Sequence, residues 1–225
     1  MSGLVVFDVD GTFLDSYTLF EKSIRDYSKL NGLPEPFYEA IRHGYSDPHA
    51  HDFKWGVSRE EQVAHLITVF NQMDEWSMSG DPERTPSLFE SVEEVLLTLK
   101  DNGHTLAIVT SKPEAPLLHL LDYHKIKNVF SAHRTWDDIA RRKEREKPEP
   151  DMLISVMKEL SFKPDRTVMV GDTTMDVRMG RAANTHTIGV AWGMHPVLHL
   201  EGAGAHHIVD THFKNIVPAV KKLLG

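Results

Sequence analysis

The sequence contains several short, uninterrupted apolar runs, each followed by polar residues or glycine. The clearest runs are residues 4–8, 105–110, 167–171 and 187–191, with a weaker one at 129–132 and an edge candidate at 206–209. An apolar run of this length without alternation is typical of a strand that is buried on both faces. Segments with helical periodicity separate the runs. This alternation predicts an α/β fold with a doubly wound, mostly parallel sheet, in which ligands bind at the carboxyl ends of the strands.

One helix is expected before the run at 105–110. Phe89, Val92, Leu96 and Leu99 recur on one helical face, and Gly103 follows them. A glycine just past the last periodic residue is a common end of a helix, because it adopts the left-handed conformation there without strain.

The interval 15–85 interrupts the alternation, because it contains no convincing strand. Apolar residues with helical spacing occur in two groups, Phe20, Ile24, Tyr27 and Leu30, and then Val63, Leu66, Ile67 and Phe70. Ser58 and Glu61 have the spacing of a capping box at the start of the second group. About 70 residues are too many for a structureless loop in a compact domain. We therefore expect a helical cap at 15–85 inserted into a core of residues 1–14 and 86–225, with a core helix starting after Thr85-Pro86.

Composition narrows the function. Lys and Arg number 25 against 33 Asp and Glu, which gives a net charge of −8 and no reason to expect a nucleic-acid or anionic-membrane partner. The chain has no cysteine, which excludes disulfides, thiolate nucleophiles and cysteine zinc sites. No apolar run approaches the roughly 20 residues of a membrane helix, and the N-terminal residues lack the basic region of a signal peptide. A cytoplasmic protein is the expectation.

Two carboxylates stand at the end of the first apolar run. Asp8 and Asp10 are two positions apart, and successive side chains of a strand point to opposite sides, so both can face one pocket while Val9 packs away. Gly11 permits a sharp turn directly afterwards. Two same-side carboxylates at a buried strand end need a cation or a proton to compensate them, which favours a functional site over a solvated acidic end.

Three further sites follow other predicted strands or a charged segment. Thr110 and Ser111 offer hydroxyls and backbone N–H groups to a phosphoryl oxygen, although a Thr-Ser pair before proline is also a good helix start. Lys147 follows the charge run 141–146, which we interpret as an exposed face. Asp172 and Asp176 follow a buried strand with i, i+4 spacing. Four carboxylates at one sheet edge predict a hard divalent cation, most naturally Mg²⁺.

In order along the chain, these residues resemble the haloacid dehalogenase superfamily of phosphotransferases. The matching segments are FDVDGTFLDS at 7–16, IVTSKP at 108–113, KPEPD at 147–151 and VGDTTMDVRMG at 170–180. The resemblance covers essentially the whole chain and is nearest to the phosphoglycolate-phosphatase-like branch, in which a helical cap occupies the place of residues 15–85. It implies a Rossmann-like core and a phosphatase that acts on a small-molecule phosphate ester.

The resemblance also implies roles for the acidic residues. Asp8 would attack phosphorus and carry an aspartyl-phosphate, and Asp10 would protonate the leaving oxygen and then activate water. Asp8, the backbone carbonyl of Asp10 and Asp172 would hold Mg²⁺, with Asp176 as an indirect or second-shell ligand.

The remaining roles concern the phosphoryl group. Gly11, Thr110 and Ser111 would bind its oxygens, and Lys147 would neutralise it and orient Asp8. Because the stretch 133–146 is longer and more charged than is usual in the family, Lys143 is the fallback for Lys147.

Several alternatives stay open. Pyrophosphate is another substrate for the same chemistry. A sugar-phosphate mutase is disfavoured, because mutases of this superfamily usually carry a different residue at the position of Thr12. A non-catalytic interaction module on the same fold should have lost Asp8, Asp10 or the lysine, and all three are present. The pair His49 and His51 superficially resembles a metal site, but its loop position favours an exposed or substrate-facing cap segment.

The specific ester is not encoded in the core motifs, because cap residues usually select it. His51, Lys54 and Arg59 are candidates, since a cation there would meet a second anionic group. A monomer and a homodimer are both compatible with the sequence.

Overall fold

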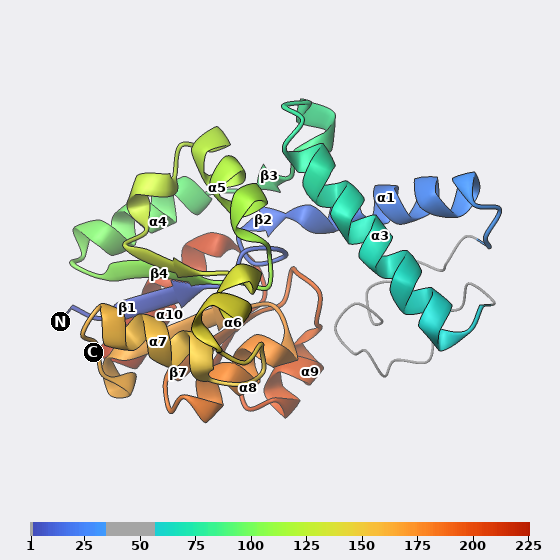
Figure 1. Cartoon of the computed structure of the whole chain (residues 1–225). Helices are drawn as coiled ribbons and strands as arrows, with labels where there is room; N and C mark the ends of the chain where they lie inside the picture. Colours follow the sequence, from blue (N-terminus) through green and yellow to red (C-terminus); the bar gives the residue numbers. More distant parts are fainter. Residues whose placement is uncertain (1, 35–56) are drawn as a thin grey trace.

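The computed structural model describes residues 2–34 and 57–225, and the backbone alone at Arg59. Its centre is a six-stranded sheet with the order β5-β4-β1-β6-β7-β8, and every neighbouring pair is parallel (Figure 1). The strands are β1 Leu4–Phe7, β4 Thr105–Val109, β5 Ala132–Arg134, β6 Thr167–Gly171, β7 His186–Val190 and β8 His207–Val209. This confirms the predicted α/β fold. β1, which bears the Asp8 motif, lies in the middle of the sheet.

The weaker strand prediction, at 129–132, was placed too early. Lys127–Val129 forms a 3-10 turn, η2, and β5 begins only at Ala132. Ile126 and Val129 are buried in the core from this turn. Their apolar character therefore reflects turn residues that pack under the sheet and not a strand.

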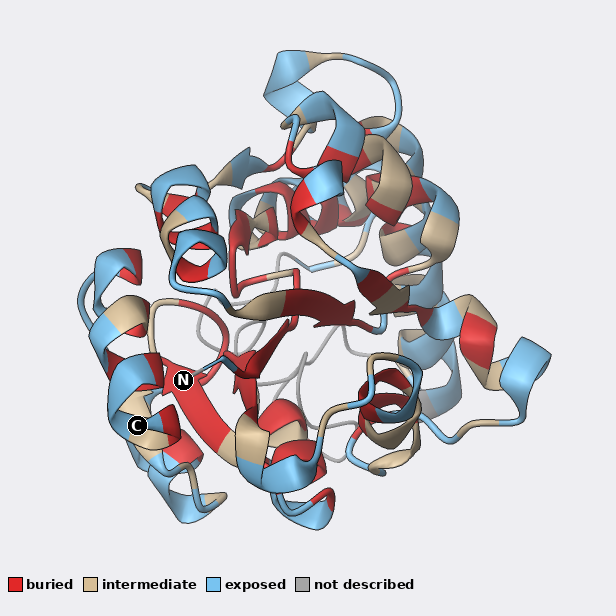
Figure 2. Cartoon of the chain, turned by 90° about the vertical axis from the view of Figure 1, so that its left-hand side faces the viewer, coloured by how far each residue is buried: buried red, intermediate tan, exposed pale blue. Residues whose placement is uncertain are grey.

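Helices cover both faces of the sheet (Figures 1 and 2). Those of the core are α4 Val92–Asp101, α5 Glu114–Tyr123, α6 Trp136–Arg142, α7 Asp151–Glu159, α8 Thr174–Ala182, α9 Val197–Gly202 and α10 Ile216–Leu224, and the other 3-10 turns are η1 Pro82–Arg84, η3 Pro164–Arg166 and η4 Phe213–Asn215. Val5 and Phe7 pack in the cluster that includes residues of α4, α5 and α10, whereas Leu4 and Val6 pack in the cluster with α7 and α8 residues. The strand thus buries alternate side chains on opposite faces, as its uninterrupted apolar sequence predicts.

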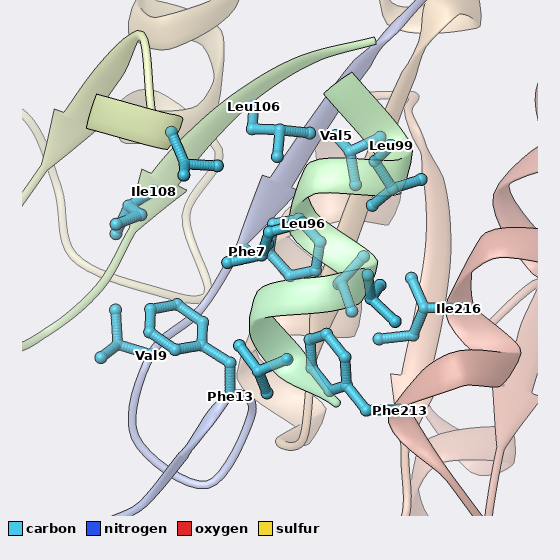
Figure 3. Packing of buried hydrophobic residues seen from close by; sticks show 14 of the residues in the cluster. Val5, Phe7, Val9, Phe13, Leu96, Leu99, Leu106, Ile108, Phe213 and Ile216 are labelled. Atoms are coloured by element: carbon cyan, nitrogen blue, oxygen red, sulfur yellow. The ribbon is translucent and has the colours of Figure 1, made fainter. Parts of the chain in front are cut away.

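Aromatic packing holds the loop that follows β1. Phe13 is fully buried, and its ring lies edge-on to Phe7 at 6.5 Å and stacked with Phe130 at 5.8 Å. Phe7 in turn stacks on Phe213 at 6.2 Å (Figure 3). Burial of such rings is among the larger contributions to a core, so the loop that follows the two carboxylates is firmly anchored.

The helix expected from Phe89 begins later. Ser91 precedes α4, and the N–H of Phe89 donates to the carbonyl of Phe13 instead of taking part in a helix. Nor does Thr85-Pro86 open a helix, because the next element is β3, Ser87–Leu88, which pairs antiparallel with β2, Leu14–Asp15. The end of α4 agrees with the prediction, since Gly103 has a φ of +84°.

Residues between β2 and β3, here called the helical segment, contain α1 Ser16–Leu30 and α3 Arg59–Ser77 in their described part. The capping box of Ser58 and Glu61 is present at the start of α3. The two helices share a small apolar cluster with Leu19, Phe20, Ile24, Val69 and Met73 at its centre. The division of the chain at residues 15 and 85 stays a prediction.

The buried face of the two helices agrees with the predicted one in part, since Phe20 and Ile24 are buried in this cluster and Tyr27, Leu66 and Phe70 pack against it. Leu30, Val63 and Ile67 are exposed to 79%, 47% and 55%. Val69 and Met73 are buried beside Leu66 and Phe70, because α3 turns this side of the helix toward α1. Among the helices of residues 2–34 and 57–225, none combines the length and apolar content of a membrane span.

Candidate active site

The loop after β1 brings two carboxylates to one cavity. The N–H of Asp8 donates to the carbonyl of Val170 at 2.9 Å, which continues the pairing with β6, and Val9 is fully buried. Asp8 and Asp10 both line a cavity of about 520 Å³, as the two-residue spacing predicts. Gly11 has a φ of +76°, and a Cβ at this position would lie 2.3 Å from Oδ2 of Asp172. The turn therefore requires glycine both for its conformation and for the close approach of Asp172.

Three carboxylates gather at the centre of the site. Asp8, Asp172 and Asp176 are buried, and each offers one oxygen within 4.8 Å of the others. Burial raises the pKa of Asp8, Lys147 lowers it and the negative charge of Asp176 raises it, and together these effects bring the pKa to about 7. Burial and the nearby Asp8 and Asp176 also raise the pKa of Asp172 well above its usual value. The cluster thus carries more negative charge than its surroundings compensate.

Lys147 lies between two of these carboxylates, although 139 residues separate it from Asp8. Its Nζ is 2.6 Å from Oδ1 of Asp8 and 2.7 Å from Oδ1 of Asp176. Burial alone would lower the pKa of this amine, but the charges of Asp176 and Asp8 raise it, so the amine stays protonated. Lys143, the fallback, is exposed at the end of α6 and is absent from the cavity lining.

Asp172 is held by groups that face it from two loops. Thr12 Oγ1 donates to its Oδ1 at 3.0 Å, and the N–H of Met194 donates to its Oδ2 at 2.7 Å. His195 completes the loop, since its N–H donates to the carbonyl of Asp172 and its Nδ1 accepts from the N–H of Thr174. Sequence reasoning missed the loop at 194–195, because its apolar and imidazole side chains carry no acidic or phosphate-binding signal.

Asp176 has a structural partner as well as Lys147. It is the third residue of α8, and its Oδ2 accepts from the N–H of Thr173 at 3.1 Å and from the Thr173 hydroxyl at 2.6 Å. This capping box orients the carboxylate so that its other oxygen contacts Lys147. Asp176 is therefore set by the helix start, which is a local feature of the sequence.

The donor set fits a hard divalent cation. Three buried carboxylates face one buried ammonium, so the cluster has an excess of negative charge when all three ionise, and a cation would offset that charge in place of protons. All the donors are oxygens, which suits Mg²⁺ and not a soft metal.

Thr110 and Ser111 line the same cavity from the end of β4. Thr110 is buried, its N–H donates to the carbonyl of Arg134, and its Oγ1 accepts from the N–H of Lys112 at 3.1 Å. Ser111 is exposed. The strand end is thus fixed in position with two hydroxyls at the cavity.

Lys112 is a further charged group at the site that sequence reasoning did not assign. It is buried, and its Nζ lies 3.2 Å from Oδ1 of Asp10 and 3.2 Å from Oδ1 of Asp74 on α3. Burial alone would lower the pKa of this amine, but the charges of Asp10 and Asp74 raise it. Burial raises the pKa of Asp74. The lysine after Thr110-Ser111 was visible in the sequence, but its partner on a helix of the helical segment was not.

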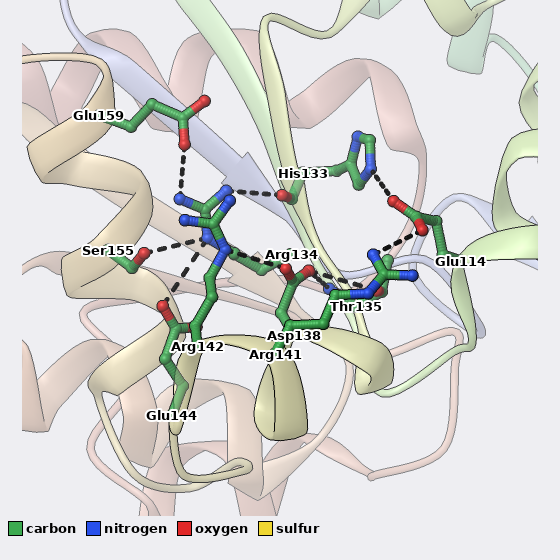
Figure 4. A network of polar contacts seen from close by, with 10 residues as sticks. All are labelled: Glu114, His133, Arg134, Thr135, Asp138, Arg141, Arg142, Glu144, Ser155 and Glu159. Atoms are coloured by element: carbon green, nitrogen blue, oxygen red, sulfur yellow. Dashed lines mark hydrogen bonds and ion pairs between the residues drawn. The ribbon is translucent and has the colours of Figure 1, made fainter.

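The charge run before Lys147 is mostly exposed, as expected, but it also fixes α6. Arg134 is buried and donates to Ser155 at 3.0 Å and to Glu159 at 2.6 Å (Figure 4). Arg142 pairs with Asp138 at 2.9 Å. Arg141 of α6 also pairs with Glu114 of α5 at 2.7 Å. This contact holds α6, whose first residue, Trp136, lines the active-site cavity.

The role of the predicted specificity residues stays a prediction. His51 and Lys54, like the neighbouring His49, lie outside the described residues. Arg59 is the first residue of α3, and its side chain is also outside the description. The helical segment instead contributes Tyr17, Phe20, Ile67, Phe70 and Met73 to the cavity.

Comparison with known sequences identifies relatives among the hydrolases and phosphatases. A model of the haloacid dehalogenase-like hydrolases matches residues 5–190. The chain is 32% identical to the probable phosphatase IndB of Dickeya dadantii, over all of this chain and 96% of that protein. It is 26% identical to the pyrophosphatase PpaX of Bacillus mycoides, over 98% of both proteins.

Solved structures with similar folds include two further proteins. An enzyme from Haemophilus somnus that is predicted to be a phosphoglycolate phosphatase superposes with a TM-score of 0.75 at 21% identity, over 96% of this chain and 97% of that one. A haloacid dehalogenase-like family protein from Streptococcus pneumoniae superposes with a TM-score of 0.74 at 19% identity, over 96% and 97%.

Proposed function

The chain belongs to the haloacid dehalogenase-like hydrolase family and is a phosphatase, and from this premise we propose that it hydrolyses a small-molecule phosphomonoester with Asp8 as nucleophile and Mg²⁺ as cofactor. The observation that carries this proposal is the contact of Lys147 with both Asp8 and Asp176 beside Asp172. These groups come from three separate segments and meet at the carboxyl end of the central strands, where α/β sheets bind ligands.

In the first step an oxygen of Asp8 forms a bond to phosphorus, and the bond from phosphorus to the ester oxygen breaks. The electron pair of that bond goes to the leaving oxygen, which takes a proton from Asp10 and departs as the alcohol. Asp10 suits this role because it lines the same cavity as Asp8, with Lys112 3.2 Å away to fix its position.

In the second step water attacks the phosphorus of the aspartyl-phosphate. Asp10 accepts a proton from the water, the bond between phosphorus and Asp8 breaks, and inorganic phosphate leaves. The sum of both steps is ester plus water to alcohol plus phosphate, and Asp8 and Asp10 return to their starting states.

The other site residues would bind the transferring group. Lys147 holds Asp8 in place and offsets charge on the phosphoryl oxygens, and Thr110, Ser111 and the backbone at Gly11 supply donors at the cavity. Asp8, Asp172 and the carbonyl of Asp10 would hold Mg²⁺, with Asp176 further out because its oxygens already accept from Lys147 and Thr173. When bound, the cation lowers the repulsion between the nucleophile and the phosphate and offsets transition-state charge.

The test is release of phosphate from a panel of small phosphate esters and pyrophosphate, with and without Mg²⁺. Asp8→Asn is nearly isosteric and should remove nearly all turnover, while Asp101→Asn, an exposed carboxylate at the end of α4, should leave it unchanged. Wild-type turnover by pure, folded Asp8→Asn would refute the nucleophile. A strong preference for pyrophosphate would show that the substrate is not an ester but pyrophosphate, for which the Bacillus relative is named.

A further inference from the structure

The active-site cavity extends well beyond the carboxylates, and its outer wall is largely apolar, although Asn71 also lines it. On the side of the helical segment the wall includes Phe20, Ile67 and Phe70, and on the core side it includes Trp136 and Met175. The cavity of about 520 Å³ is in the range that accommodates a drug-sized ligand, roughly 300–1,000 Å³. A phosphoryl group and the site residues that bind it account for only the inner end.

The aromatic part of this wall is firmly built. The rings of Phe20 and Phe70 are stacked at 5.1 Å with an angle of 9° between their planes. Phe20 is buried in the cluster with Val69 and Met73. A rigid aromatic surface binds flat or branched apolar groups without the entropic cost of ordering a loop.

Two large apolar side chains of the wall are left facing water. Ile67 is 55% exposed and Trp136 is 49% exposed, and they approach the cavity from α3 and α6 respectively. An apolar ligand body between them would remove this surface from water, which is a favourable contribution to binding.

The described part of the wall offers no cation dedicated to a second anionic group. Among the described residues that line the cavity, the cations are Lys112 and Lys147, and both already contact carboxylates. Lys112 is shared by Asp10 and Asp74, so a second negative charge on a ligand would meet carboxylates there and not an uncommitted ammonium.

We propose that the substrate is the monophosphate ester of an alcohol with an aromatic or branched apolar body. This inference rests on the proposed phosphatase activity and specifies its substrate class. The phosphate occupies the inner end beside Asp8, and the apolar body lies between Phe70, Ile67 and Trp136.

The experiment compares three esters under the same conditions with Mg²⁺: ethyl phosphate, 2-phenylethyl phosphate and phosphoglycolate. The first two have the same kind of primary alkoxide leaving group, so a difference in kcat/KM reports binding of the ring and not leaving-group reactivity. We expect 2-phenylethyl phosphate to exceed each of the other two by at least about tenfold, the lower end of what apolar groups achieve in such pockets.

Paired variants on α3 locate the effect. Ile67→Asn should lower kcat/KM for 2-phenylethyl phosphate several-fold and leave ethyl phosphate nearly unchanged. Val63→Asn is the matched control, since it is an exposed aliphatic residue one turn earlier that is absent from the cavity lining. It should change neither substrate.

Equal kcat/KM for the two alkyl esters, or preference for phosphoglycolate, would overturn the proposed substrate class while leaving the phosphatase activity intact. If no ester is hydrolysed, the proposed function fails, and calorimetric titration of Asp8→Asn still tests the pocket. Affinity for 2-phenylethyl phosphate at least about tenfold above that for ethyl phosphate would support it, and equal affinities would overturn it.

Discussion

The excess of buried carboxylate charge makes the metal-free protein less stable as the pH rises from 6 to 8. Asp8 has a pKa of about 7 in the folded protein, compared with 3.8 for an unperturbed aspartate. Between these values the folded state binds a proton that the unfolded state has lost. The stability contributed by this proton is fully present below pH 3.8 and is lost as the pH rises through about 7. Asp172, whose pKa is also raised, acts in the same direction.

The size of this loss of stability follows from the pKa of Asp8. With a folded pKa near 7, Asp8 is mostly protonated at pH 6 and mostly ionised at pH 8. One pKa unit corresponds to about 1.4 kcal/mol, and integration over this interval gives about 1.4 kcal/mol for Asp8 alone. Mg²⁺ competes with these protons, so it should stabilise the protein more at pH 8 than at pH 6. At a concentration of 100 times its Kd at the pH in question, the total stabilisation is about 2.7 kcal/mol.

Urea unfolding at pH 6, 7 and 8 measures the prediction, once with a chelator and once with Mg²⁺. Asp8→Asn is the control, because it removes the titrating group with little change in shape. Subtracting its pH dependence from that of the wild type isolates Asp8 from the histidines that titrate in the same range. Equal pH dependence of the two proteins in the chelator would refute the reasoning.

Three other substitutions test single contacts. Gly11→Ala combines a left-handed backbone with a Cβ 2.3 Å from a carboxylate oxygen, so it should lower both the melting temperature and phosphate release far more than Gly32→Ala, which has a φ of +63° and open space. Thermal unfolding with an activity assay compares the two, and similar losses would contradict the steric argument. Phe13→Ala should cost about 3–5 kcal/mol in urea unfolding, because it empties a fully buried site; a cost below 1 kcal/mol would be inconsistent with that packing. Asp74→Asn removes one of the two carboxylates at Lys112 and loosens α3 from the core, so steady-state kinetics should show a higher KM with a smaller change in kcat, whereas an unchanged KM would show that this contact does not hold the helical segment.

Features that depend on residues close together in the sequence could be predicted from the sequence. The two-residue spacing of Asp8 and Asp10 places both at one cavity because strand side chains alternate. The start of α3 followed from the pattern of Ser58 and Glu61. The strands β1, β4, β6 and β7 were recognisable because a buried parallel strand must be apolar on both faces.

Boundaries and buried faces were less predictable. Phe89 has helical spacing with the residues of α4, yet its N–H donates to Phe13, since pairing of β2 with β3 takes this part of the chain out of the helix. Val63 and Ile67 also fit a helical period, but only the position of α1 decides which stripe of α3 is buried.

Contacts between distant segments were decided by the tertiary structure alone. Lys147 meets Asp8 because the strand order puts β1 beside β6 and the segment before α7 against their ends. Lys112 meets Asp74 because α3 packs beside α5, a relation that leaves no periodic signal in either segment. The sequence by itself therefore determined which residues carry the chemistry, through spacing that acts over a few residues. Their partners, and the apolar wall opposite them, depend on the packing of elements far apart in the chain, which only the folded structure specifies.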